Sequence, residues 1–240
     1  MTSPSIHGRD GSNDTLPTNH VTDELLAAYA AGNLSEAQSL LVATHSALCP
    51  ECRAAIAEFE AVGASFLEEI APESMRAGSL DSVLARLDQE EMPANNVVQH
   101  PSSYSAPDRQ IGEVLLPQPL RGYVGSDLRD VTWRPVIRGL EEAELKVSGP
   151  EFNVRLIKVA AGAAMPQHSH QGEELTLVLT GAYQDGSGRF ARGDVQIADG
   201  DVDHQPTAEP DEACVCLIIT DAPIKLTGRL GRLLNPFIRY

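Results

Sequence analysis

The first 118 residues contain no lysine and only five arginines, against 17 acidic residues. Residues 119–240 hold 13 basic and 17 acidic residues, so most of the net charge of −16 lies in the N-terminal half. Binding to phosphate groups depends on Lys and Arg. The shortage therefore argues against nucleic acid and anionic membrane surfaces as partners. The acidic residues keep a protein soluble, and they would also suit a basic protein partner.

Long apolar runs are also missing. No stretch approaches the roughly 20 residues that a membrane-spanning helix needs. The N-terminal segment has neither the basic start nor the apolar centre of a signal peptide, so we expect a disordered lead-in and a cytoplasmic location. The chain has only four cysteines. In a reducing compartment, paired cysteines are more often metal ligands or redox groups than disulfides.

The pattern along the chain changes once. The first third has helical periodicity and helix-start residues, and a segment rich in Pro, Ser, Asn and Gln follows it. Beyond that segment, short apolar runs alternate with glycine turns, as in an all-β barrel or sandwich. The sequence thus predicts an α+β protein with four parts: a disordered lead-in 1–18, a helical domain 19–91, a linker 92–118 and a β domain 119–240.

The last predicted helix, residues 79–91, carries an apolar stripe at i, i+3, i+4, i+7 spacing. The stripe consists of Leu80, Val83, Leu84 and Leu87. Such a stripe either packs in a core or forms a docking face for a partner, and the sequence leaves both interpretations open.

The segment "THSALCPECR" places His45, Cys49 and Cys52 in an H-x3-C-x2-C pattern. A redox C-x-x-C pair normally follows a strand, whereas this one lies between two predicted helices. The start of a helix lowers the pKa of a thiol and favours metal binding. A closed zinc site needs four ligands, and His20, just before the first predicted helix, can supply the fourth. Zinc would then stabilise a helical module with a small core.

A second group of metal-ligand residues lies in the β region. His168 and His170 alternate on a predicted strand, so their rings share a side, with Glu174 four residues on and His204 on a later strand. Three imidazoles and a carboxylate suit Zn, Mn, Fe or Ni.

The spacing around this second group resembles the first signature of the cupin superfamily. It runs from Gly162 through the two histidines and Glu174 to Gly181. The segment that supplies His204 resembles the second signature, although Ala198 replaces the usual proline and one extra residue precedes the histidine. The resemblance implies a cupin jelly-roll barrel for residues 119–240. Cupins include both enzymes and sensors, so the fold alone does not select a function.

Cys214 and Cys216 alternate on another predicted strand and would share one side of it. They either pack as small apolar residues in the barrel or form an oxidation-sensitive pair connected with a signal.

The H-x3-C-x2-C module, joined to a three-His, one-Glu cupin, resembles the ChrR family of zinc-dependent anti-sigma factors. The resemblance implies a cytoplasmic regulator that sequesters an extracytoplasmic-function sigma factor and has no catalytic residues. The cupin would sense singlet oxygen or related oxidants, and the stripe on the last helix would contact sigma. The alternative is a metal-dependent cupin enzyme, a dioxygenase or isomerase, with a zinc-stabilised regulatory module.

Overall fold

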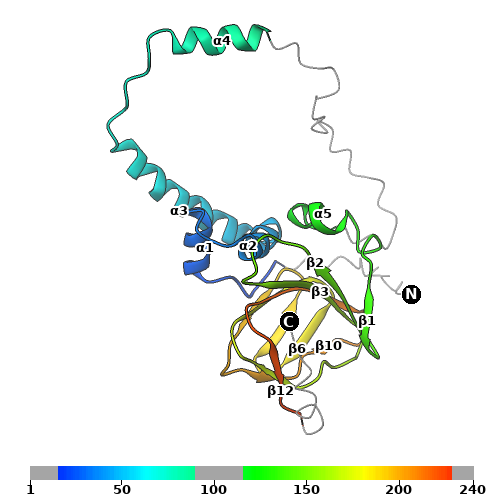
Figure 1. The fold of residues 1–240 in the computed structure, drawn as a ribbon. Coiled ribbons are helices and arrows are strands. Elements are labelled where there is room, and N and C mark those ends of the chain that lie inside the picture. The colour runs from blue at the N-terminus through cyan, green and yellow to red at the C-terminus, as the bar shows by residue number, and fades with distance from the viewer. Residues whose placement is uncertain (1–15, 90–115, 229–240) are drawn as a thin grey trace, which may run out of the picture. The chain divides into compact units, whose positions relative to one another are not determined.

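The structure, a computed structural model, describes residues 16–89 and 116–228 (Figure 1). The predicted lead-in up to residue 15 and most of the predicted linker lie outside these ranges. In the described part of the chain, no helix is long and apolar enough to cross a membrane.

Helices form the N-terminal part, as the sequence predicts. They are α1 Asp23–Ala30, α2 Glu36–Leu48, α3 Pro50–Glu68 and α4 Ser79–Gln89. The start of α2 is fixed by a capping box, in which the Gln38 backbone N–H donates to Ser35 Oγ at 3.2 Å. The Thr22 hydroxyl accepts from the first turn of α1, and Pro50, whose fixed φ suits a helix start, begins α3. Local sequence therefore determines where these helices begin.

The C-terminal part is a β-barrel of the predicted all-β class. Its six-stranded sheet has the order β1-β2-β3-β11-β5-β8 and is antiparallel throughout. The strands of this sheet are β1 Arg134–Ile137, β2 Leu140–Leu145, β3 Asn153–Val159, β5 Glu174–Thr180, β8 Val195–Ala198 and β11 Cys214–Thr220. Two three-stranded sheets, β10-β6-β7 and β12-β4-β9, complete it. Their strands are β4 His168–His170, β6 Ala182–Asp185, β7 Gly188–Ala191, β9 Asp203–His204, β10 Thr207–Ala208 and β12 Ile224–Leu226.

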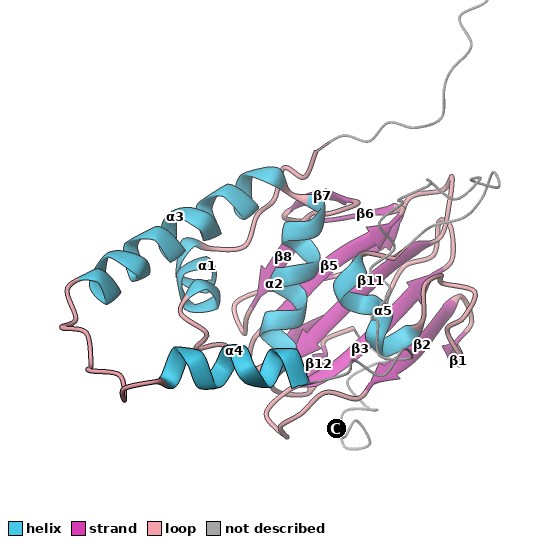
Figure 2. Ribbon diagram, turned by 90° about the horizontal axis from the view of Figure 1, so that it is seen from above, coloured by secondary structure: helices cyan, strands magenta, loops and turns pink. Residues whose placement is uncertain are grey.

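The large sheet has two apolar faces, and β11 shows the alternation clearly. Val215, Leu217 and Ile219 belong to a core that the sheet shares with the helices. Cys214 and Cys216 belong to a second core inside the barrel. Because side chains alternate along a strand, one buried strand serves both cores. Figure 2 shows α2 lying across the outer face of this sheet, where it contacts β5 and β11.

The described chain divides differently from the predicted domains. Among the described residues, one compact unit joins residues 16–61 with residues 116–228, and the second comprises residues 62–89. The reason is the shared core: Leu41 and Val42 of α2 are completely buried in the same cluster as the sheet residues. The first two helices and the start of α3 thus pack with the β-barrel.

Helix α5, Gln118–Val124, has no counterpart among the elements predicted from the sequence. Its start lies in the linker that composition predicts for residues 92–118. Leu116 and Leu120 are nevertheless completely buried in the shared core, and the contact of α5 with α2 provides the stabilisation that local sequence does not.

Candidate functional site

The structure brings His20, His45, Cys49 and Cys52 together, and their ligand atoms all lie within 4.8 Å of one another. These four residues are called the first cluster. His20 precedes α1, His45 lies in the last turn of α2, Cys49 ends that helix and Cys52 lies in the first turn of α3. The junction of α2 and α3 therefore positions three of the four side chains, and the segment before α1 positions the fourth.

The distances in the first cluster suit a tetrahedral ion. His45 Nε2 lies 3.1 Å from Cys52 Sγ, and His20 Nδ1 lies 3.3 Å from Cys49 Sγ and 3.5 Å from Cys52 Sγ. Ordinary zinc–nitrogen and zinc–sulfur bonds in a tetrahedron require nitrogen–sulfur separations of about 3.5 Å. The donor set and its spacing therefore fit a closed, four-ligand metal site.

Burial controls the electrostatics of the first cluster. It lowers the pKa of His45, so the ring is neutral, and its Nδ1–H donates to the Gly193 carbonyl at 2.7 Å. The lone pair on Nε2 therefore faces the cluster. Burial, together with neighbouring Cys49, raises the pKa of Cys52 to about 12. At Cys52, burial thus outweighs the lowering of the thiol pKa that the start of the helix was expected to cause. Two thiolates in this buried place require a cation beside them.

The structure also brings His168, His170, Glu174 and His204 together, all buried. These residues are called the second cluster. His168 and His204 are paired across β4 and β9, and Glu174 begins β5. His204 Nε2 lies 3.2 Å from Nε2 of both other histidines. Three imidazole nitrogens and a carboxylate therefore face a common point inside the barrel.

Hydrogen bonds orient the rings of the second cluster. His168 Nδ1 donates to the Pro166 carbonyl at 2.8 Å, and His204 Nδ1 donates to Asp185 Oδ2 at 2.7 Å. Both bonds leave Nε2 free as a ligand atom, which is the usual arrangement around metal-binding histidines. Burial opposes ionisation of Asp185, but hydrogen bonds from Gln196, Ser187 and His204 lower its pKa to about 2. Asp185 therefore stays an anionic acceptor.

The protonation states in the second cluster also suit a metal. Burial and the neighbouring His168 and His204 lower the pKa of His170 to about 4, and burial lowers that of His168. Near neutral pH these imidazoles are unprotonated and able to bind a cation. Burial raises the pKa of Glu174, and Thr176 Oγ1 donates to its carboxylate at 3.1 Å. A cation between these groups would favour the carboxylate form of Glu174.

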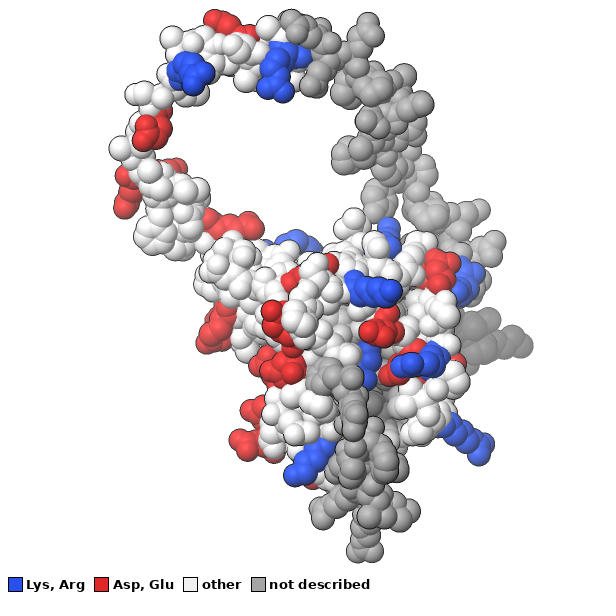
Figure 3. Space-filling model, in the orientation of Figure 1, with Lys and Arg blue, Asp and Glu red and all other residues white. Residues whose placement is uncertain are grey.

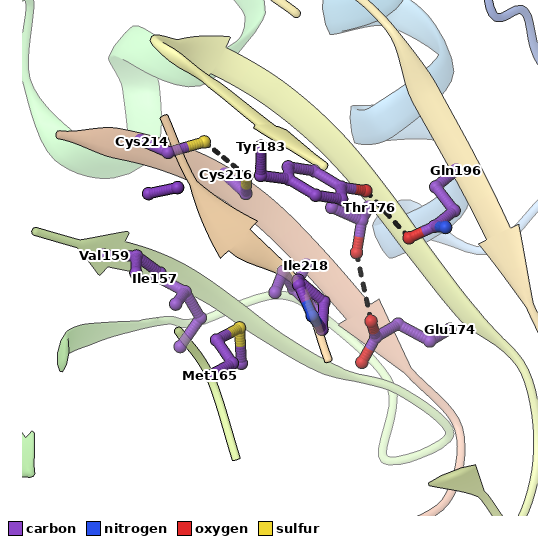
Figure 4. A pocket seen from close by; sticks show the side chains of 12 residues that line it. Ile157, Val159, Met165, Glu174, Thr176, Tyr183, Gln196, Cys214, Cys216 and Ile218 are labelled. Atoms are coloured by element: carbon purple, nitrogen blue, oxygen red, sulfur yellow. Dashed lines mark hydrogen bonds between the residues drawn. The ribbon is translucent and has the colours of Figure 1, made fainter. Parts of the chain in front are cut away.

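A pocket of about 370 Å³, including its open mouth, lies beside Glu174 in the barrel (Figure 4). Cys214 and Cys216 line it, with their sulfur atoms 3.6 Å apart and both thiols free. The hydrogen bond between Cys216 and Cys214, together with burial, raises the pKa of Cys216. Both thiols thus face the barrel interior, in a largely apolar pocket that also contains Glu174 of the second cluster.

The stripe on α4 is exposed in the structure. Leu80, Val83, Leu84 and Leu87 keep between 49% and 64% of their surface accessible. The end of α3 and the segment after it expose further large apolar side chains of the second compact unit: Val62, Phe66, Leu67, Ile70 and Met75. These nine residues, which are spread along α3, the segment after it and α4, are together called the apolar surface. Only its α4 part was predicted from the sequence as a possible docking face.

The sequence analysis did not identify the residues that orient the cluster histidines. Gly193, Asp194, Asp185 and Gln196 belong to ordinary turn and strand patterns. Their partners lie far away in the sequence, as with the 148 residues between His45 and Gly193. No local signal marks them.

Comparisons with known proteins agree with this geometry. Residues 122–222 match the family model described as the ChrR Cupin-like domain. The chain is 47% identical over 220 residues to the anti-sigma-E factor ChrR of Cereibacter sphaeroides, covering 92% of this chain and 97% of that protein. It is also similar to a chain in the crystal structure of Rhodobacter sphaeroides SigE in complex with the anti-sigma ChrR. There the TM-score is 0.67 and the identity 45%, over 85% of this chain and 98% of that one.

Proposed function

This chain belongs to the ChrR family of anti-sigma factors, and on that premise we propose that it binds a sigma factor and represses the transcription that this factor directs. The sigma factor is of the extracytoplasmic-function type, and the complex forms in the cytoplasm. The relatives are named as anti-sigma factors rather than enzymes, which disfavours the alternative of a cupin dioxygenase or isomerase.

The observation that carries this proposal is the apolar surface. Exposed apolar patches of this kind mark interaction sites, and α4 has no buried residue among those described. In Figure 3 the surface of α4 is mostly uncharged, with a few acidic and basic side chains. An amphipathic helix of this type docks by placing its apolar stripe in a groove of a partner. We assign Leu80, Val83, Leu84 and Leu87 to that contact.

The charge of the N-terminal half supports a basic partner. With 17 acids and five arginines in the first 118 residues, this part of the chain attracts proteins that bind DNA or RNA polymerase through basic surfaces. Electrostatic complementarity of this kind mainly speeds association and selects the partner. The apolar surface then supplies most of the affinity.

We assign Zn²⁺ to the first cluster. Two thiolates and two imidazoles are a common ligand set for structural zinc, and such sites keep no open coordination position. Zinc would hold the start of α1 and the junction of α2 and α3 in one geometry. The second cluster would also hold a metal, zinc or alternatively Mn, Fe or Ni, because nitrogen and oxygen ligands suit all of them.

The cupin barrel is the sensory part of this proposal. Singlet oxygen or a related oxidant would act in the barrel, where Cys214 and Cys216 lie beside Glu174 in one pocket. Oxidation of the pair, or a change at the second cluster, would alter the free energy of the sigma-bound state and release the sigma factor. Such a coupling requires a difference in free energy between the two states.

The test is a pull-down of a purified extracytoplasmic-function sigma factor by the full-length chain, with metal content measured on the same sample. We expect an equimolar complex, two metal ions per chain, and inhibition of sigma-dependent transcription in a purified system. Unchanged sigma-dependent transcription in a strain that lacks this gene would contradict the proposed function.

A further inference from the structure

The turn between β7 and β8 of the cupin lies directly against the first cluster. The carbonyl oxygen of Gly193 accepts the Nδ1–H of His45 at 2.7 Å, and the His45 side chain is completely buried. This bond selects the ring tautomer and directs Nε2 toward Cys52. A residue of the cupin therefore orients a ligand that belongs to the helices.

The same turn also holds the segment that carries His20. Asp194 Oδ1 accepts the backbone N–H groups of Thr18, at 2.6 Å, and Asn19, at 2.9 Å. The carbonyl of Asn19 in turn accepts the backbone N–H of Val195 at 3.0 Å. Both backbone groups of the residue before His20 are thus bound to the cupin. Asp194 is only 3% exposed, so these bonds are shielded from water.

The shape of the turn depends on glycine. Gly193 has a φ of +91°, and a Cβ added there would lie 2.5 Å from Pro17 Cγ. Any larger residue would therefore strain the turn and push the segment before His20 away from it. Two of the four ligands in the first cluster, His20 and His45, rely on this turn for their position.

Strand β8 leads from this turn to the second cluster. Gln196, two residues after Asp194, donates through Nε2 to Asp185 Oδ2 at 2.8 Å. The same carboxylate oxygen accepts His204 Nδ1 at 2.7 Å. From Gly193 to Gln196 the strand covers only about 10 Å. One short stretch of backbone therefore contacts the residues that orient ligands in both clusters.

We infer that Gly193 and Asp194 are positioning residues for the first cluster, and that β8 couples the geometry of the second cluster to metal retention by the first. Residues that orient metal ligands typically change metal affinity about 10- to 100-fold when they are replaced. Such a coupling of binding free energies is reciprocal, so metal in the first cluster would affect metal binding by the second to the same extent. This inference rests on the proposed metal role of the first cluster and is independent of sigma binding.

In the test, the full-length chain is loaded with Co²⁺, an excess of chelator is added, and the rate of cobalt loss is measured. Absorption from thiolate-to-cobalt charge transfer reports the first cluster alone, since the second cluster contains no cysteine. We expect Asp194→Ala to speed the loss of this absorption about 10-fold or more. Asp194→Asn keeps an oxygen that accepts from Thr18 and Asn19 and loses only the bond from the Ala191 backbone N–H to Oδ2. Its rate of cobalt loss should therefore be much closer to that of the wild type than the rate of Asp194→Ala is.

Asp211→Ala is the matched control, because Asp211 is an exposed aspartate of the same barrel and its replacement should leave the rate unchanged. Gly193→Ala perturbs the turn without removing a hydrogen-bond acceptor. It tests the same positioning role if Asp194→Ala does not fold. Equal rates for Asp194→Ala, Gly193→Ala and the wild type would overturn the positioning role. A wild type without charge-transfer absorption would instead refute the proposed metal site.

Gln196→Leu tests the coupling, because it removes the bond to Asp185, together with those to Ser187 and Tyr183, and replaces none of the cluster residues. We expect a loss of the first-cluster absorption several-fold faster than in the wild type. If Asp194→Ala is fast and Gln196→Leu matches the wild type, the coupling through β8 is refuted.

Discussion

Truncation of the α4 stripe should weaken sigma binding and leave the folded protein intact. Leu80 and Leu84 are 64% and 49% exposed, so docking can bury about half or more of each side chain. Complete burial of a leucine contributes about 1.5–3 kcal/mol, which gives roughly 1–2 kcal/mol for each residue at this interface. The double variant Leu80→Ala/Leu84→Ala should therefore raise the Kd for sigma about 30- to 1000-fold.

The assay is titration calorimetry of the full-length chain with a purified extracytoplasmic-function sigma factor. Ser82→Ala, at another exposed position of α4, is the control and should leave the Kd within about twofold. Alanine is a good helix former, so circular dichroism and the unfolding temperature should not change in either variant. A Kd for the double variant equal to that of the control would refute the assignment of this stripe to the sigma contact.

Three further outcomes are expected. Cys49→Ser removes a ligand of the first cluster, so metal analysis should fall from two ions per chain to one, with a lower unfolding temperature. Replacing Cys214 and Cys216 by serine should leave the affinity for sigma unchanged and weaken the transcriptional response to singlet oxygen; an unchanged response would refute a role for this pair. Leu41→Ala opens a cavity in the shared core and should cost about 2–5 kcal/mol, with helix and strand signals unfolding in one transition. Val62→Ala, at an exposed position, is the control for this variant.

The four N-terminal helices and both ligand clusters could be predicted because their signals are local. The capping box at Ser35, the proline at the start of α3 and the alternation of His168 and His170 depend on neighbours within a few residues. Two members were exceptions. His204 lies 30 residues after Glu174 and was predicted from the resemblance to the second cupin signature. His20 lies 25 residues before His45. It was found by counting the ligands that a closed site needs, and the structure places its Nδ1 beside both thiols.

The shared core and α5 could not be predicted in the same way. Leu41 and Leu120 are ordinary apolar residues in their own segments, and only the fold shows that both are buried in one core with the sheet. The apparent boundary after the first third reflects a change of secondary structure. It does not correspond to a gap in packing, and composition cannot distinguish these two cases.

The two clusters differ in ways that suit different tasks. The first cluster offers four protein ligands at a junction of helices. A tetrahedral metal bound there would have no open coordination position for a reactant. The second lies beside a pocket that contains two thiols, and a small oxidant could reach it there. Cys52 lies in the first turn of α3, the same helix whose later residues, Val62 and Phe66, belong to the apolar surface. A change that starts in the barrel and loosens the first cluster through β8 would therefore release the start of a helix that carries part of the docking surface. Loss of sigma binding can follow from that release without any change in the docking residues themselves.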